Sequence, residues 1–153
     1  MVPGNMITSF RGENAFLSNM FDVPISYKGY TFINAESAFQ SQKQPDIADQ
    51  FVGLSGPEAK RKGCKVHIRP DWDSAKDEIM LEVLRAKFLN KDMRSRLLNT
   101  GDAYIVEGNG YHDNYWGYCT CSNCALKDKH NKLGIMLMKI RDECKMGERN
   151  ESN

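Results

Sequence analysis

The sequence predicts a helix-dominated α+β fold in a single compact domain with a few short strands. Its 153 residues are the length of one domain. Segments with apolar residues at helical spacing outnumber the strand-like segments, which are short and gather mainly in the N-terminal third. Strands and helices do not alternate regularly, so a parallel doubly wound sheet is not expected. We place the domain at 1–145 and expect a flexible polar tail at 146–153.

A hairpin followed by a helix is expected in the N-terminal third. Residues 25–28 and 30–33 carry β-branched and aromatic side chains on either side of Gly29, a pattern typical of two strands joined by a tight turn. Asn34 is a favourable N-cap because its side-chain oxygen can accept a hydrogen bond from the first helical turn. We therefore predict a helix over 35–42 directly after the hairpin.

The longest helix is expected to begin after Asp73 or Ser74, either of which can cap it, and to end near Leu89. Its apolar stripe at helical spacing consists of Ile79, Met80, Val83, Leu84 and Phe88. A strand is expected at 104–107, followed at 108–131 by a long irregular loop of the kind that is often functional. Further helices are expected at 47–52, 57–62, 93–98 and 132–145.

Composition and charge exclude several classes of protein. The formal net charge is only +1, so the chain lacks the overall positive field that would make long nucleic acid its main ligand. No apolar stretch reaches the roughly 20 residues that cross a bilayer, and residues 1–5 lack the features of a secretion signal. The five cysteines are therefore expected to be reduced thiols in a cytoplasmic protein.

The predicted helix over 35–42 begins a polar stripe. Glu36, Gln40 and Lys43 recur at i, i+4 and i+7, which places them on one face. Glu36 falls in the first turn, where the helix dipole favours an ionised carboxylate. Such a carboxylate can stabilise an oxocarbenium-like transition state or activate water. The alternative is a solvated helix face that begins with an ordinary acidic residue.

Aromatic and polar residues are dense in the loop at 111–118. Aromatic rings stack on bases and ribose, while Asp113 and Asn114 can hold hydroxyl groups, so the segment favours nucleotide recognition. The alternative is a loop attached to the core by Trp116 and its neighbouring tyrosines.

Three cysteines follow this aromatic segment. Cys119, Cys121 and Cys124 form a C-x-C-x-x-C pattern, and with one histidine they could complete a tetrahedral structural zinc site. His112 and His130 are both near in sequence, and we take His130 as the fourth ligand. The alternative is three reduced thiols that brace the loop, because the spacing is not that of paired CxxC motifs.

Two cationic features remain. The basic stretch at 60–69 could meet a phosphate through Arg69, or it could be an ordinary solvated helix end. Lys87 falls on the same side of the longest helix as Met80 and Leu84. A lysine there either extends to water along its aliphatic stem or reaches into a cleft.

The order of these residues along the chain resembles the NADAR family. The resemblance extends from about Ile7 to Arg141, and although each piece alone is common, the ordered set is specific. The pieces are Phe10, Leu17-Ser18-Asn19, Ala35-Glu36, Gln40, Lys43, Trp72-Asp73, Met80, Ala86-Lys87-Phe88, Leu97-Leu98-Asn99-Thr100-Gly101, Glu107, Asp113, Trp116-Gly117, Asn131-Lys132-Leu133-Gly134 and Leu137-Met138-Lys139-Ile140-Arg141.

The resemblance implies a compact, mainly helical α+β domain that hydrolyses a bond between ribose C1′ and a nitrogen without a cofactor. Family members resemble N-glycosidases of phosphoribosylamino-pyrimidine intermediates in riboflavin synthesis, or hydrolases that remove ADP-ribose from guanine in nucleic acid. The expected partner is a small ribosyl-nucleotide, free dinucleotide or ADP-ribose-type substrate, or ADP-ribosylated nucleic acid, and not a membrane. The implied catalytic residues are Glu36, Lys87 and Asp113. The implied ligand-binding residues are Asn19, Gln40, Lys43, Arg69, Trp116, Gly117 and Asn131.

The chain departs from the family pattern in two places. Ser37 follows Glu36 where the family often has histidine, and cysteines follow Gly117 where the family often has a short Gly-rich loop. These departures keep two other functions open. One is a non-catalytic module that binds ADP-ribose or another NAD-derived ligand, and the other is a zinc-braced nucleic-acid-binding protein.

Overall fold

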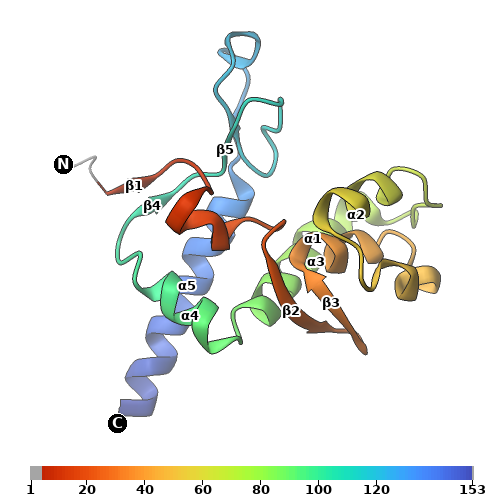
Figure 1. Ribbon diagram of the computed structural model, residues 1–153. Helices are drawn as coiled ribbons and strands as arrows, with labels where there is room; N and C mark the ends of the chain where they lie inside the picture. The colour runs from red at the N-terminus through yellow and green to blue at the C-terminus, as the bar shows by residue number, and fades with distance from the viewer. Residues whose placement is uncertain (1–4, 153) are drawn as a thin grey trace. The chain divides into compact units, whose positions relative to one another are not determined.

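The computed structural model describes residues 5–152, whose elements group into two compact units (Figure 1). The central unit spans Asn19–Met93, and the terminal unit combines Met1–Ser18 with Arg94–Asn153. Helices dominate, and the strands among the described residues form three two-stranded sheets, so the predicted α+β class is confirmed. One domain over 1–145 stays a prediction. Residues 1–4, at the position examined for a secretion signal, and 153, at the end of the predicted tail, lie outside the described residues.

The predicted hairpin is confirmed in the central unit. Strands β2 (Asp22–Tyr27) and β3 (Tyr30–Asn34) pair antiparallel, with Tyr27 opposite Tyr30. The two turn residues, Lys28 and Gly29, have φ angles of 49° and 88°. Positive φ at both positions suits the two-residue turn whose twist matches that of the flanking strands.

The predicted helix after the hairpin is also confirmed, as α1 (Ala35–Ser41). The Asn34 side chain accepts a hydrogen bond of 2.8 Å from the backbone N–H of Ser37, and it donates one of 3.0 Å to the carbonyl of Leu54. Every residue of α1 is buried, so this short helix is enclosed on all its faces. Polar side chains on it are therefore held in low-dielectric surroundings.

Three further elements complete the central unit. Helices α2 and α3 both contact α1, and α3 also contacts β2 (Figure 1). A capping box between Ser55 and Glu58 begins α2, because each side chain bonds to the other residue's backbone N–H. The bounds are η2 (Pro45–Phe51, a 3-10 helix), α2 (Gly56–Gly63) and α3 (Trp72–Lys87).

The predicted start of α3 is wrong. The N-cap is Asp71 rather than Asp73 or Ser74, and the helix begins at Trp72. Asp71 is a favoured N-cap residue type, but its side chain makes no capping bond and instead pairs with Arg69. Asp73 lies in the first turn, where its charge still complements the helix dipole.

The terminal unit joins both ends of the described chain. Strand β1 pairs in parallel with β4, with Met6 opposite Tyr104, and β4 also contacts α5. Strands β5 and β6 form a second parallel pair inside the segment predicted to be irregular. The bounds are β1 (Met6–Ile7), η1 (Gly12–Leu17), α4 (Lys91–Leu98, which begins in the central unit), β4 (Tyr104–Ile105), β5 (Gly108–Asn109), β6 (Tyr118–Cys119), η3 (Ser122–Cys124) and α5 (Lys132–Ser152).

The last helix differs from the prediction in length. Helix α5 continues to Ser152, beyond the predicted end at Lys145, so the described part of the expected flexible tail is helical. With 21 residues it is longer than α3, which has 16 and had been expected to be the longest. No proline follows Lys145 in the chain, and Gly147 lies within the helix rather than ending it. Among the described residues, no helix is both long and apolar enough to cross a membrane.

Candidate active site

Glu36 belongs to a cluster of buried polar side chains in the central unit. It lies in the first turn of α1 with 9% of its surface exposed, so the solvated-face interpretation is wrong for it. The Gln40 side-chain amide donates a hydrogen bond of 2.6 Å to Glu36 Oε2, which confirms that the predicted i, i+4 pair meets. The backbone N–H of Glu36 donates to the carbonyl of Asn19 at 2.9 Å, so Asn19 is fixed beside the same turn.

Two amide oxygens near Glu36 have no partner. Asn19 Oδ1 and Gln40 Oε1 are both buried and accept no hydrogen bond within the protein. The Asn19 amide nitrogen lies 3.5 Å from Met80 Sδ, a weak acceptor. A side chain at Gly63 would collide with Gln40 Oε1, so the glycine lets α2 approach this amide closely. Unpaired buried acceptors are costly, and a ligand hydroxyl that donates to them removes that cost.

Lys43 and Arg69 are neighbours in the central unit, since the backbone N–H of Arg69 donates to the carbonyl of Lys43 at 2.8 Å. The Lys43 ammonium is 5.8 Å from the centre of the Trp72 ring and 3.5 Å from the carbonyl oxygen of Gly63. Burial lowers the pKa of Lys43, while nearby Cys64 and Glu36 oppose this effect. Arg69 bonds bidentately to Asp71 at 2.6 and 2.9 Å, which raises the pKa of the guanidinium. A phosphate bound by Arg69 therefore has to compete with that carboxylate.

Lys87 is fully buried at the end of α3, so it does not extend to water. It follows Met80 by two helical turns on the apolar face, and its ammonium lies 5.4 Å from the centre of the Phe88 ring. Burial lowers the pKa of Lys87 from 10.5 to about 7. A lysine in this condition exchanges its proton near neutral pH, as a general acid or base must.

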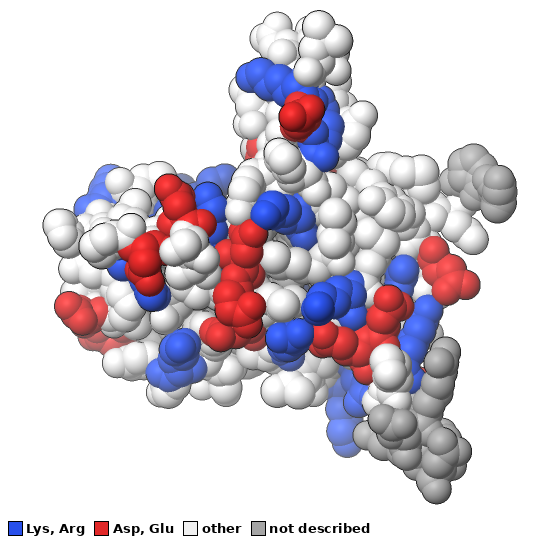
Figure 2. All heavy atoms as spheres, turned by 180° about the vertical axis from the view of Figure 1, so that it is seen from behind, with Lys and Arg blue, Asp and Glu red and all other residues white. Residues whose placement is uncertain are grey.

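Figure 2 shows acidic and basic side chains interspersed on the face that it presents. The basic stretch includes Lys60, Arg61 and Lys62 in the last turn of α2, where cations complement the helix dipole. This agrees with the small net charge of +1.

In the terminal unit, Asp113 organises the aromatic segment. Its Oδ1 accepts hydrogen bonds from the backbone N–H groups of Tyr115 at 3.1 Å and Trp116 at 2.9 Å. Trp116 is half-buried and packs edge-on against Tyr115 at a centroid distance of 4.9 Å. The structure thus gives Asp113 a role in holding the loop, and its predicted catalytic role stays a prediction.

Asn131 and Gly117 position Glu107, which the sequence reasoning left out of the site. The Asn131 side chain accepts from the backbone N–H of Glu107 at 3.0 Å and donates to the carbonyl of Ile105 at 2.9 Å. Gly117 packs so closely that any side chain there would collide with Glu107. Glu107 in turn accepts from the Tyr111 hydroxyl at 2.8 Å. The ligand contacts predicted for Asn131, Gly117 and Trp116 stay predictions.

The three cysteines of the loop come together around a histidine, but the predicted histidine is wrong. His112, Cys119, Cys121 and Cys124 place their ligand atoms within 4.8 Å of one another. His130 is outside this group, and its ring lies 6.3 Å from that of Tyr115. The thiols and imidazole are one set that could hold a metal ion. Because β5 and β6 pair, His112 is brought back to Cys119, a contact that local spacing does not reveal.

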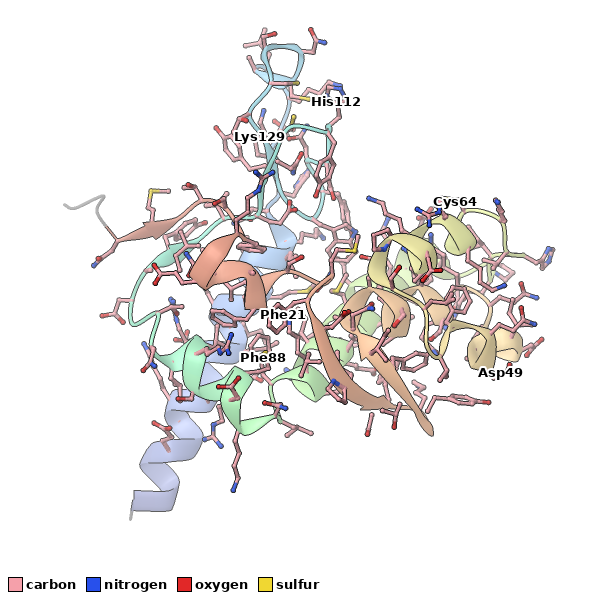
Figure 3. All side chains as sticks on the ribbon, viewed as in Figure 1. Phe21, Asp49, Cys64, Phe88, His112 and Lys129 are labelled. Atoms are coloured by element: carbon pink, nitrogen blue, oxygen red, sulfur yellow. The ribbon has the colours of Figure 1, made fainter. Side chains whose placement is uncertain are left out.

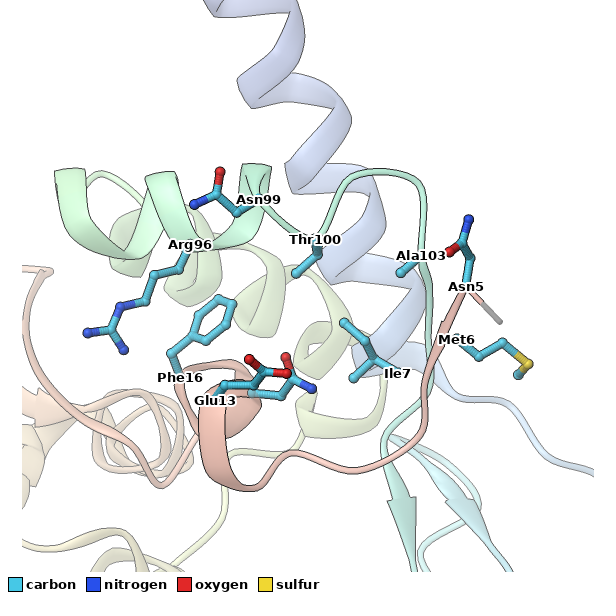
Figure 4. Close-up of a pocket in the computed structure, with 10 residues that line it drawn as sticks. Asn5, Met6, Ile7, Glu13, Phe16, Arg96, Asn99, Thr100 and Ala103 are labelled. Carbon is cyan, nitrogen blue, oxygen red and sulfur yellow. The ribbon is translucent and has the colours of Figure 1, made fainter. Parts of the chain in front are cut away.

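A pocket of about 430 Å³ lies elsewhere in the terminal unit, lined from η1, α4 and the β1 region (Figure 4). None of the predicted site residues lines it. Arg96 lies above the Phe16 ring at 6.0 Å in this pocket. This pocket is therefore separate from the predicted site residues.

Comparison with known proteins identifies the family. The NADAR domain model matches residues 6–145. N-glycosidase YbiA of Escherichia coli strain K12 is 35% identical over 132 residues, which cover 82% of this chain and 79% of that protein. Riboflavin biosynthesis protein VVA0006 of Vibrio vulnificus is 30% identical over 139 residues, covering 86% of this chain and 36% of that protein. The NMR structure of E. coli YbiA superposes with a TM-score of 0.77 at 29% identity, over 94% of this chain and 88% of that one. The chain therefore belongs to the NADAR family.

Proposed function

We propose that this protein is an N-glycosidase, a hydrolase that cleaves the bond between ribose C1′ and a nitrogen of a small ribosyl-nucleotide substrate. Family membership and the names of the similar N-glycosidases support the reaction class. The observation that carries the proposal is the buried Glu36 carboxylate, held by Gln40 beside two unpaired amide oxygens. The carboxylate is complementary to a ribosyl cation, and the amide oxygens are complementary to the hydroxyl groups beside it.

Glu36 supplies the negative charge that the reaction needs. As the C1′–N bond breaks, positive charge develops on the ribose ring, and a fixed carboxylate stabilises it or removes a proton from the attacking water. The Gln40 amide orients the carboxylate through Oε2. Asn19 Oδ1 and Gln40 Oε1 accept hydrogen bonds from ribose hydroxyls, which supplies the partners that both oxygens lack.

The cationic residues of the central unit take the remaining roles. Lys43 and Arg69 bind the substrate phosphate, with Asp71 displaced from the guanidinium when phosphate is present. Lys87 donates the proton that the departing nitrogen requires, because its lowered pKa lets it give up a proton at neutral pH. No step requires a metal ion or an organic cofactor.

The favoured substrates are phosphoribosylamino-pyrimidine intermediates of riboflavin synthesis, since one similar protein is named a riboflavin biosynthesis protein. ADP-ribosylated guanine and free dinucleotides offer the same type of bond. Parallel product assays on these three substrates, with catalytic amounts of protein, should release ribose phosphate from the first. Release of ADP-ribose instead would reassign the substrate, and tight binding with no product from any of them would favour the non-catalytic ligand-binding module.

The test of the site is Glu36→Gln, which keeps the shape of the side chain and removes its charge. We expect turnover to fall by about 10²-fold or more, with the affinity for substrate and the far-ultraviolet circular dichroism preserved. Glu78→Gln is the matched control, because Glu78 is an exposed acid on α3 of the same unit. Turnover in Glu36→Gln equal to that of the control would refute the assignment.

A further inference from the structure

The strongest feature outside the proposed catalytic residues is the cluster of three thiols and one imidazole in the loop at 108–131. His112 Nδ1 lies 3.3 Å from Cys121 Sγ, 3.3 Å from Cys124 Sγ and 3.9 Å from Cys119 Sγ. Figure 3 shows His112 directed toward sulfur atoms of this loop. All four ligand atoms lie within 4.8 Å of one another.

Hydrogen bonding alone does not account for this geometry. A neutral imidazole Nδ1 has a single lone pair or a single proton, so it makes one good hydrogen bond, yet three sulfur atoms surround it. In a tetrahedral zinc site the metal lies about 2.3 Å from sulfur and about 2.0–2.1 Å from nitrogen, which separates the nitrogen from each sulfur by about 3.6 Å. The three observed separations fall on either side of that value.

Hydrogen bonds to the backbone position the four ligand residues. The β5–β6 pair brings Cys119 beside the chain that leads to His112, whose backbone N–H donates to Cys119 Sγ at 3.3 Å. The turn η3 closes the C-x-x-C segment, with a hydrogen bond of 3.1 Å from Cys124 N to Cys121 O. Asn114 Oδ1 accepts from Cys119 N at 2.9 Å. Backbone N–H donors to ligand sulfur, and hydrogen bonds that orient ligand residues, are the supporting contacts that metal sites need.

The chemistry of the set selects the metal and its role. Three soft sulfur ligands with one imidazole suit zinc and do not suit calcium or magnesium, which prefer oxygen. Four protein ligands complete a tetrahedron and leave no open position for water or substrate, so the site is structural rather than catalytic.

We propose that His112, Cys119, Cys121 and Cys124 bind one structural zinc ion. Each cysteine loses its thiol proton to solvent on binding, and the neutral imidazole contributes its Nδ1 lone pair. The ion ties together the two sides of the loop, next to Asp113, whose carboxylate caps the aromatic segment. Zinc thereby fixes the backbone of that segment, and this proposal does not depend on the glycosidase activity.

The first experiment measures metal content in the full chain purified under reducing conditions. We expect one zinc per chain in the unaltered protein, and loss of that zinc in Cys121→Ser and in His112→Asn. Cys64→Ser and His130→Asn are the matched controls, because both residues lie outside the cluster, and they should retain the metal. The proposal is overturned if the unaltered chain carries no stoichiometric zinc, or if His112→Asn retains zinc as fully as His130→Asn.

A second measurement does not depend on how the variants fold. Cobalt(II) added to the metal-free, reduced chain should give sulfur-to-cobalt charge-transfer absorption and the intense visible bands of a tetrahedral site, at one cobalt per chain. Absence of these bands would refute the site. Hydrogen exchange should then show that amides at 109–124 lose protection without the metal, while those of the central unit keep it. Unchanged protection at 109–124 would refute the bracing role.

Discussion

Replacing Lys87 with methionine should stabilise the protein below neutral pH, because it removes a buried ammonium while keeping a similar side-chain volume. The pKa of Lys87 is about 7 when folded and 10.5 in its ordinary state. At about 1.4 kcal/mol for each pH unit, this difference corresponds to about 5 kcal/mol. The unfavourable contribution is complete below pH 7, where the folded state holds the charge, and it disappears as the pH rises to 10.5.

The pH dependence is the decisive part of this prediction. Between pH 7 and 10.5 the unfolded state binds the proton and the folded state does not, so stability rises with pH. The advantage of Lys87→Met in the free energy of unfolding should therefore fall from about 5 kcal/mol at pH 6.5 to about 2 kcal/mol at pH 9. Contacts that do not titrate contribute equally to the free energy of unfolding at every pH. The change of the variant's advantage with pH therefore reports on the Lys87 charge alone.

Urea unfolding followed by circular dichroism at four pH values measures this slope directly. Lys91→Met is the control, because Lys91 is exposed in the next helix and should show no such trend. An advantage of Lys87→Met that stays constant from pH 6.5 to 9 would refute the reasoning. If Lys87 is also the proton donor, the variant should lose turnover while it gains stability, a trade common at functional sites.

Three further predictions concern positions where close packing or hydrogen bonding holds a neighbouring residue in place. Gly63→Ala should push Gln40 away from its place and lower kcat with little loss of stability, as steady-state kinetics and unfolding midpoints would show; an unchanged kcat contradicts this. In Gly117→Ala the new methyl group should collide with Glu107 and lower the free energy of unfolding by about 1–3 kcal/mol. Denaturant titration measures this, and a free energy of unfolding equal to that of the wild type would contradict the prediction. Asn131→Ala should cost about 2–4 kcal/mol in the same measurement, because one buried and one part-buried backbone group lose their partners, and a cost under 1 kcal/mol would show that water replaces the amide.

The parts of the fold that the sequence predicts well are set by neighbours along the chain. Asn34 caps the helix over Ala35–Ser41 through a residue three positions away, and Glu36 meets Gln40 four positions away. Such contacts follow from helical geometry alone. The hairpin around Gly29 is local in the same sense, because two residues with positive φ determine its register.

The predictions that were wrong or left open concern positions that packing decides, rather than spacing along the chain. The fourth ligand was assigned to His130, whereas the pairing of β5 with β6 selects His112. For Lys87 the helical spacing left both an extension to water and a position in a cleft open, and only the tertiary packing around its helix shows that it is enclosed. The last helix was predicted to end at Lys145, but it continues to Ser152, because polar side chains do not stop a helix that meets no proline.

The parallel pairing of β1 with β4 has a consequence for the order of folding during synthesis. Met6 is translated before Asn19–Met93, whereas its partner Tyr104 is translated only after the whole of that unit. At about 5–20 residues per second, the N-terminal strand waits on the order of 5–20 s for its partner. The contiguous central unit can therefore fold first, while β1 stays without its partner strand until Arg94–Asn153 is synthesised.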